Sequence, residues 1–183
     1  MLVDDINNSN SDSSPLLQMK GLRIEGLSDK GWQEIVCGID LQLNRGEILG
    51  LIGESGAGKS TIGLAAMGFA KDGCRIIDGE IDFDGIELRK APEWQKRKLR
   101  GTRISYVAQS AAAAFNPAHR LINQFTEGPI EHDLLSEAKA KEKGRTLYRT
   151  LDLPDPDYIG ERWPHQVSGG QLQRMMVAMS MSC

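Results

Sequence analysis

The sequence lacks any apolar run approaching the roughly 18 residues that a membrane-spanning helix needs, which argues against an integral membrane protein. Its start shows no basic stretch followed by an apolar one, so we expect no secretory signal peptide. The cysteines are few, odd in number and widely spaced, without metal-type pairs: Cys37, Cys74 and Cys183. This pattern fits a reducing compartment, in which thiols serve as small apolar side chains.

The chain also lacks an excess of positive charge. Its net charge of −3 argues against sequence-independent binding to nucleic-acid backbones. With 40% hydrophobic and 26% charged residues, the 183-residue chain has the composition of a folded domain rather than of a disordered or membrane protein. Residues 1–18 are the exception, because they are rich in Asn, Ser and Asp. They predict a disordered lead-in, with order beginning near Met19.

Several segments of the first half predict strands. Polar and apolar residues alternate around Leu22 and Ile24 and again over Ile35–Leu43, as they do in half-buried strands. The segment Glu47–Gly53 is a short apolar run with no polar face. Such a run favours a strand that is buried on both faces, as in a parallel sheet.

Two Asp-Gly pairs, Asp78-Gly79 and Asp84-Gly85, are turn signals on either side of Ile81 and Phe83. They predict an antiparallel hairpin here. Residues 103–108 predict a further short strand. Elsewhere the spacing of apolar residues or the residues at the segment ends predict helices. The predicted helices cover residues 62–69, 92–100, 121–125, 135–151 and 170–181.

The glycine-rich segment between the apolar run and the first helix carries the clearest chemistry. Gly53–Ser60 matches G-x-x-x-x-G-K-[ST] in full. Glycines let successive backbone N–H groups turn toward a phosphate, and the helix that follows presents its positive end to the anion. Lys59 would reach the β- and γ-phosphates, and the hydroxyl of Ser60 would bind Mg²⁺. The motif predicts nucleotide binding, although it does not identify the kind of NTPase.

A second motif opens the last predicted helix. Ser168 followed by Gly169 and Gly170 places a hydroxyl and free backbone N–H groups at a helix N-terminus. This arrangement is either a second anion site or an ordinary serine cap punctuated by glycine.

Together these motifs resemble the ATP-binding subunits of ABC transporters. The family markers are GESGAGKS, a glutamine after a strand (Gln109 within ISYVAQS) and a signature sequence, here VSGGQ. Finer features resemble the oligopeptide, dipeptide and nickel importer branch: GESGAGKST, Phe115-Asn116-Pro117, and Trp163-Pro164-His165 before the signature. The resemblance covers Met19–Cys183.

The resemblance implies a role for each matching residue. Lys59 and Gln109 would serve catalysis, and Ser60 and Gln109 would bind Mg²⁺. Trp32 would stack on the adenine ring. The signature residues would bind the γ-phosphate of an ATP molecule held by the opposite subunit. The implied nucleotide-binding set is Trp32, Gly53, Glu54, Ser55, Gly56, Ala57, Gly58, Lys59, Ser60, Thr61, Gln109, Ser168, Gly169, Gly170 and Gln171.

The resemblance also implies an α/β fold of the P-loop NTPase class. A RecA-like core with an antiparallel β-subdomain would occupy residues 19–109, and a helical subdomain residues 110–183. The implied partners are membrane permease subunits, a second ATP-binding subunit in a head-to-tail dimer and, indirectly, a periplasmic or extracellular substrate-binding protein, with no nucleic acid. The implied location is the cytoplasmic face of the membrane, or the cytoplasm for a free fragment.

In that family, the strand that holds the Mg²⁺ shell, the catalytic glutamate and the switch histidine all follow the signature helix. The chain ends at Cys183, before any of them. We therefore expect a C-terminally incomplete fold with exposed apolar strand edges, and a polypeptide that does not turn over ATP alone. Two alternatives stay open: a non-catalytic interaction fragment, and an ABC-type ATPase that is not involved in transport.

Overall fold

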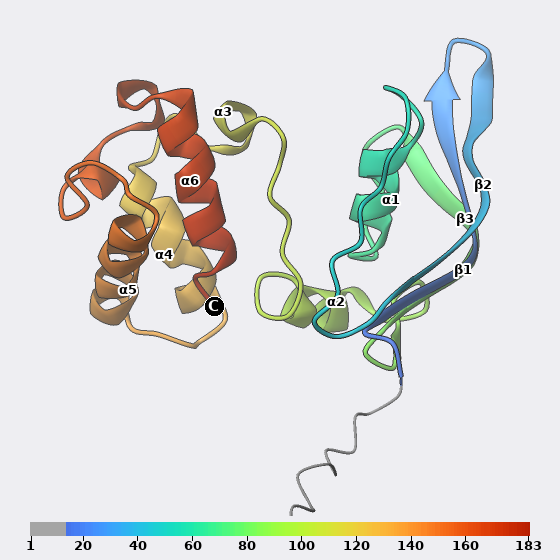
Figure 1. Cartoon of the computed structure of the whole chain (residues 1–183), viewed down its shortest axis with the longest axis horizontal. Helices are drawn as coiled ribbons and strands as arrows, with labels where there is room; N and C mark the ends of the chain where they lie inside the picture. The colour runs from blue at the N-terminus through green and yellow to red at the C-terminus, as the bar shows by residue number, and fades with distance from the viewer. Residues whose placement is uncertain (1–13) are drawn as a thin grey trace, which may run out of the picture. The chain divides into compact units, whose positions relative to one another are not determined.

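The computed structural model describes residues 14–183, so most of the predicted lead-in lies outside the described residues. The chain divides into two compact units, one ending at Ala91 and the other beginning at Pro92 (Figure 1). The first strand begins at Leu17, two residues before the predicted start of order. The assignment of residues 19–109 to the ATP-binding core stays a prediction.

The first unit is built on a four-stranded antiparallel sheet in the order β2-β1-β3-β4. Its elements are β1 (Leu17–Ser28), β2 (Gly31–Leu43), α1 (Lys59–Ala65), β3 (Cys74–Phe83) and β4 (Ile86–Glu87). Cross-strand pairs bring apolar side chains together, because Met19 faces Ile81 and Ile24 faces Val36. All four are buried, which gives the sheet one apolar face.

The predicted hairpin is confirmed at one turn and wrong at the other. Asp84 and Gly85, with φ of 53° and 80°, connect β3 to β4. Asp78-Gly79 instead lies inside β3 and is not a turn. Gly79 has φ of 94° and sits where the β1–β3 register shifts. The turn signal therefore marks an irregularity of the ladder, which a residue with positive φ allows.

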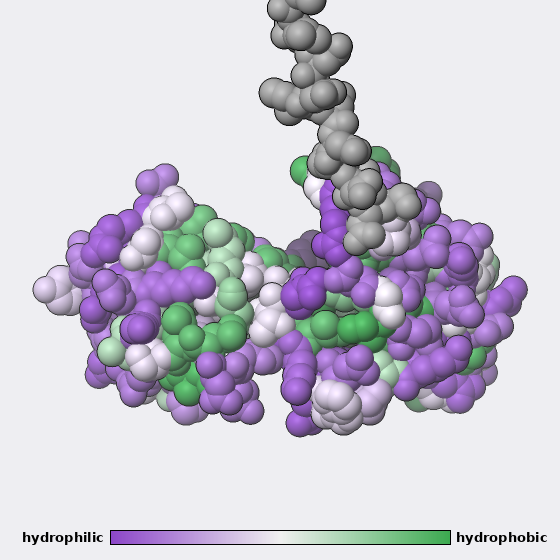
Figure 2. Space-filling view, turned by 90° about the horizontal axis from the view of Figure 1, so that it is seen from below, coloured by the Kyte–Doolittle hydropathy of each residue, from purple (hydrophilic) through white to green (hydrophobic). Residues whose placement is uncertain are grey.

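The predicted buried strand at Glu47–Gly53 is not formed. The segment has no strand assignment, and the side chains of Ile48 and Ile52 are 97% and 99% exposed. A strand needs a neighbour that takes up its backbone hydrogen bonds, and within residues 14–183 no strand pairs with this segment. The apolar residues of this segment are exposed, but they lie in irregular chain and not at the strand edges expected from the sequence. Figure 2 shows apolar side chains at the surface among more abundant hydrophilic ones.

The strand predicted for residues 103–108 is also absent. Its only ladder contact is an isolated bridge between Arg100 and Ile104, and the segment then runs on without regular structure. Tyr106 and Val107 are exposed. As at Glu47–Gly53, the apolar and β-branched residues favour a strand, but no paired neighbour stabilises it among the described residues.

The second unit is helical, and its predicted helices are confirmed. Its α-helices are α2 (Glu93–Leu99), α3 (Ala111–Ala114), α4 (Leu121–Glu131), α5 (Glu137–Thr150) and α6 (Gly169–Ser180), with short 3₁₀ turns η1 (Ile159–Glu161) and η2 (Pro164–Gln166). The helix predicted for 121–125 continues to Glu131, with Pro129 tolerated inside it. Among residues 14–183, no helix is both long and apolar enough to cross a membrane.

The core of the second unit lies among α4, α5 and α6 (Figure 1). Phe125 of α4 and Tyr148 of α5 meet edge to face, with ring centroids 5.7 Å apart. Met175 and Leu172 of α6 are buried in the same cluster, so the stripe of apolar residues on α6 is a core face. Burial, with the Glu161 carboxylate adding to it, raises the pKa of the Tyr148 hydroxyl.

Candidate functional site

The glycine-rich segment forms an open loop that leads into α1. Gly56 and Gly58 have φ of 85° and 80°, a conformation that side chains with a Cβ rarely adopt. A Cβ on Gly58 would lie 3.2 Å from both the carbonyl oxygen of Ile35 and Cγ2 of Val36. The loop therefore packs against β2 at the residue that precedes α1, and both the backbone conformation and this close approach favour glycine.

Lys59 holds the loop together from the inside. Its ammonium donates hydrogen bonds to the carbonyl oxygens of Gly53, at 2.7 Å, and Glu54, at 2.5 Å. The loop residues Glu54–Ala57 are exposed. The Lys59 ammonium is thus held against the backbone of an exposed loop, an arrangement suited to a phosphate group.

The residues at the start of α1 fit a magnesium-nucleotide complex. Ser60 follows Lys59 in the first turn of α1 and is exposed, so its hydroxyl is available as a ligand. Within the described part of the chain, no group of three or more His, Cys, Asp or Glu side chains could hold a metal ion.

The sheet register places Trp32 on one face of β2 and the loop contact at Val36 on the other. Trp32 pairs with Leu27 and therefore lies on the same face of the sheet as Glu25. Val36, which contacts the loop, lies on the opposite face, because the β1–β2 register shifts between Ile24 and Glu25. The Arg75 guanidinium lies 4.2 Å from the centre of the Trp32 ring and also pairs with Glu25 at 2.7 Å. The adenine-stacking role of Trp32 stays a prediction, which this register does not favour.

The signature motif forms a complete capping box at the start of α6. The Ser168 hydroxyl accepts a hydrogen bond from the Gln171 N–H at 3.3 Å, and the Ser168 N–H donates to the Gln171 side-chain oxygen at 2.8 Å. A Cβ on Gly169 or Gly170 would meet no atom within 4 Å. The serine-cap interpretation is thus confirmed, while anion binding at these open glycines stays a prediction.

Gln109 lies in the same unit as the signature motif and is exposed. The residue before it is held to α6. The Ala108 N–H donates to the Met176 sulfur at 3.1 Å, and the Gln173 side chain donates to the Ala108 carbonyl at 3.2 Å. Sequence reasoning did not single out Gln173. The signal that could have pointed to it was its position on the signature helix, two residues after Gln171.

A family profile and curated relatives match this chain. The family profile described as ABC transporter matches residues 36–183. The probable peptide ABC transporter ATP-binding protein y4tR of Sinorhizobium fredii is 32% identical over 176 residues, which cover 96% of this chain and 52% of that protein. The oligopeptide transport ATP-binding protein OppD of Escherichia coli is 34% identical, over 92% of this chain and 50% of that protein. The chain thus spans about half the length of these curated relatives.

Solved structures agree on the fold. A dimeric ATP-binding cassette in a post-hydrolysis state, bound to ADP and Pi, superposes with a TM-score of 0.76 at 18% identity, covering 91% of this chain and 69% of that one. A dimeric bacterial ABC transporter cassette gives a TM-score of 0.78 at 20% identity, with the same coverage. They confirm the predicted α/β fold of the P-loop NTPase class. With the Gly53–Ser60 loop, the signature cap and the family profile in agreement, the chain belongs to the ABC transporter family.

Proposed function

We propose that this chain is the nucleotide-binding part of an ABC importer ATPase and that it binds MgATP through Gly53–Thr61. The observation that carries the proposal is the Lys59 ammonium, held between the carbonyls of Gly53 and Glu54 inside the exposed loop. A cation already held at the loop attracts a phosphate and loses less conformational freedom on binding than a mobile one.

The proposed division of labour follows the resemblance. Lys59 and Gln109 act in catalysis, with Ser60 and Gln109 as protein ligands of Mg²⁺, which neutralises phosphate charge when bound. Ser168, Gly169, Gly170 and Gln171 contact a nucleotide held by a second ATP-binding subunit. Openness at Gly169 and Gly170 supports this part of the proposal, because a phosphate can approach their backbone without meeting a side chain.

The transported substrate is proposed to be a peptide, with nickel as the other substrate of this branch. The support is in the names of the relatives, which include a D,D-dipeptide transport ATP-binding protein of Escherichia coli, 33% identical over 93% of this chain and 52% of that protein. The proposed partners are membrane permeases, a second ATP-binding subunit and, indirectly, a substrate-binding protein. The proposed place of work is the cytoplasmic face of the membrane.

Nucleotide binding is tested by titrating the protein with a fluorescent ATP analogue in the presence and absence of Mg²⁺. Lys59→Ala removes the cation and is expected to weaken binding about 10- to 100-fold, the range for a charged hydrogen bond. Lys71→Ala, an exposed lysine of the same unit outside the loop, is the matched control and is expected to bind as the parent does. Equal effects of the two substitutions, or no Mg²⁺-dependent binding, contradict the proposal. Phosphate release by the same samples measures whether this polypeptide alone turns over ATP.

A further inference from the structure

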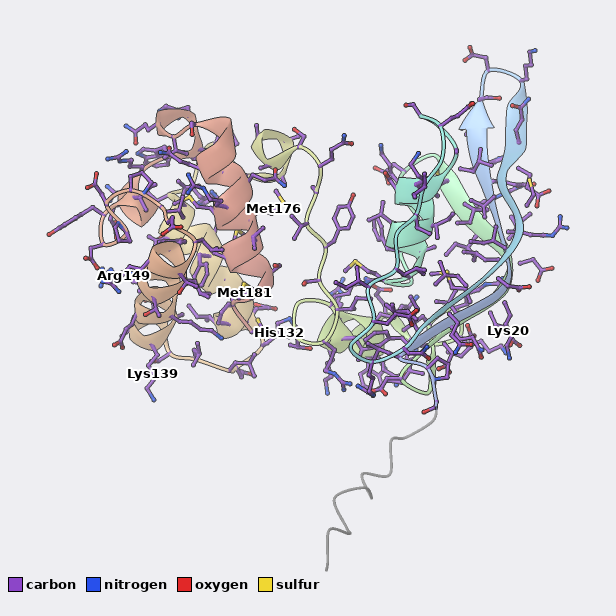
Figure 3. The ribbon with its side chains drawn as sticks, viewed as in Figure 1. Lys20, His132, Lys139, Arg149, Met176 and Met181 are labelled. Carbon is purple, nitrogen blue, oxygen red and sulfur yellow. The ribbon has the colours of Figure 1, made fainter. Side chains whose placement is uncertain are left out.

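One stripe of the signature helix holds the segment that leads to Gln109. Gln173 donates to the Ala108 carbonyl at 3.2 Å, Met176 accepts from the Ala108 N–H at 3.1 Å, and the carbonyl of Ser180 accepts from the Ser105 hydroxyl at 3.4 Å. These three positions are spaced by three and four residues, so they lie on one side of α6. Figure 3 labels Met176 on this helix.

The contact made by Gln173 acts on one particular peptide group. The carbonyl oxygen that it binds belongs to the peptide linking Ala108 to Gln109. Because a peptide unit is planar, a hydrogen bond to its oxygen also fixes the direction of the Gln109 N–H. The thioether of Met176 holds the peptide on the other side of Ala108, so the backbone entering Gln109 is restrained twice.

The next residue of α6 connects the helix elsewhere. Arg174 donates to the carbonyls of Leu151, at 3.2 Å, and Asp152, at 2.5 Å, in the loop after α5. Gln173 and Arg174 are therefore two neighbouring side chains that tether the same helix to two different segments. Of these two tethers, only that of Gln173 reaches the peptide that leads into Gln109.

We infer that Gln173 is a positioning residue that sets the place of Gln109 relative to the signature motif. It lies five residues after Ser168, about 7.5 Å along the helix axis. A shift of the helix start is therefore transmitted to the Ala108–Gln109 peptide through the Gln173 side chain, while Met176 holds the peptide before it. The inference rests on the proposed function, since it assumes that Gln109 and Ser168–Gln171 both serve the nucleotide.

The test is amide hydrogen exchange and ¹⁵N chemical shifts in the nucleotide-free protein. Gln173→Met keeps the size of the side chain and removes the donor, and Gln173→Glu removes the donor while leaving the shape. Both remove the hydrogen bond that the Ala108 carbonyl accepts and are expected to move the Gln109 amide resonance. Because the backbone around Ala108 is then less restrained, the bond from the Ala108 N–H to Met176 is expected to open more often and to speed exchange of the Ala108 amide about three- to ten-fold. The matched control is Arg174→Met, which removes the neighbouring tether and is expected to leave Ala108 exchange within about two-fold of the parent.

The inference is overturned if Arg174→Met disturbs Ala108 and Gln109 as much as the Gln173 variants do, because Gln173 would then act only through general stability. It is also overturned if the Gln173 side-chain amide of the parent protein exchanges as fast as a free one, a measurement that needs no variant. Since no nucleotide is present, these outcomes do not depend on whether Lys59 binds ATP. A failure of the proposed function is seen separately, in the Lys59→Ala titration.

Discussion

At the scale of single residues, Gly79 shows how closely β1 and β3 approach. A Cβ at this position would lie 2.5 Å from the Leu22 Cα, and the backbone has φ of 94°. Gly79→Ala therefore adds both backbone strain and a collision with main-chain atoms that cannot turn aside. We expect it to lower the free energy of unfolding by about 2–4 kcal/mol, measured by urea denaturation.

A substitution at Gly85 separates the effect of backbone strain from that of the collision. It also has positive φ, at 80°, but a Cβ there would meet nothing within 4 Å. Gly85→Ala is expected to cost only the strain, about 1–2 kcal/mol. If Gly79→Ala costs no more than Gly85→Ala, the close approach of Leu22 to Gly79 is not present in solution.

A second prediction at this scale concerns Glu87. Burial raises its pKa, but hydrogen bonds donated by the backbone N–H groups of Ile81, Arg89 and Lys90 outweigh burial, and the pKa of the carboxyl lies below its ordinary 4.5. A depressed folded-state pKa contributes stability that is present above about pH 4.5 and is lost as the pH falls through the folded value.

Glu87→Gln removes this charge while keeping the size of the side chain. We expect the variant to be about 1 kcal/mol less stable than the parent at pH 7, with the difference shrinking below pH 4.5. Denaturant titrations of both proteins at several pH values measure it. A difference that stays constant with pH contradicts the assigned role of the carboxylate.

At the scale of elements, the packing of α4 on α5 depends on a glycine. A Cβ on Gly144 would lie 3.0 Å from Cδ1 of Phe125 and 3.1 Å from Cδ1 of Ile122. Alanine is the better helix former by about 1 kcal/mol, but overpacking costs about 1–3 kcal/mol. We expect Gly144→Ala to lower the free energy of unfolding of this unit by about 1 kcal/mol.

Gly128 of α4 provides the control for this substitution. A Cβ there would meet its nearest atoms at 3.6 Å, an ordinary contact. Gly128→Ala is expected to be neutral or to stabilise the unit by up to about 1 kcal/mol. Thermal unfolding followed by circular dichroism compares the two. If both alanines stabilise, α4 and α5 are further apart than described.

Substitutions at Ser168 measure how much the cap at the start of α6 contributes to stability. Ser168→Ala removes the side-chain acceptor for the Gln171 N–H and is expected to cost about 1 kcal/mol. Ser168→Asp retains a good cap and should unfold within about 0.5 kcal/mol of the parent. Urea titrations of the three proteins measure this. If both variants lose the same stability, the capping box is not what holds the helix start.

At the scale of the whole molecule, the segment Glu47–Gly53 exposes apolar side chains to solvent. Ile48 and Ile52 are almost fully exposed. Exposed apolar side chains and unpaired backbone N–H and C=O groups both promote association between chains. We expect the protein to self-associate and the double substitution Ile48→Lys with Ile52→Lys to raise its monomer fraction, measured by light scattering after size exclusion. Leu27→Lys, at a residue 60% exposed in the β1–β2 hairpin, is the control and should change little. A parent protein that is already a uniform monomer contradicts the prediction.

Sequence reasoning succeeded where the governing interactions are local. The helix from Pro92 ends before Gly101, and Ser168 begins α6, because caps and helical periodicity act within a few residues. It was wrong for Glu47–Gly53 and for residues 103–108, where a strand depends on neighbours far away in sequence. Asp78-Gly79 was misread for a related reason, since only the position of β1 decides that its glycine serves a strand irregularity.

By itself, the sequence determined the family of this protein, because the identity and spacing of Gly53–Ser60 and of VSGGQ are covalent facts. Only the tertiary structure decided that Trp32 and Val36 lie on opposite faces of β2, since one shift of register reverses a side chain. It also decided that Gln173 holds the peptide before Gln109. That contact joins residues 65 positions apart, and only the packing of α6 against that segment brings them together.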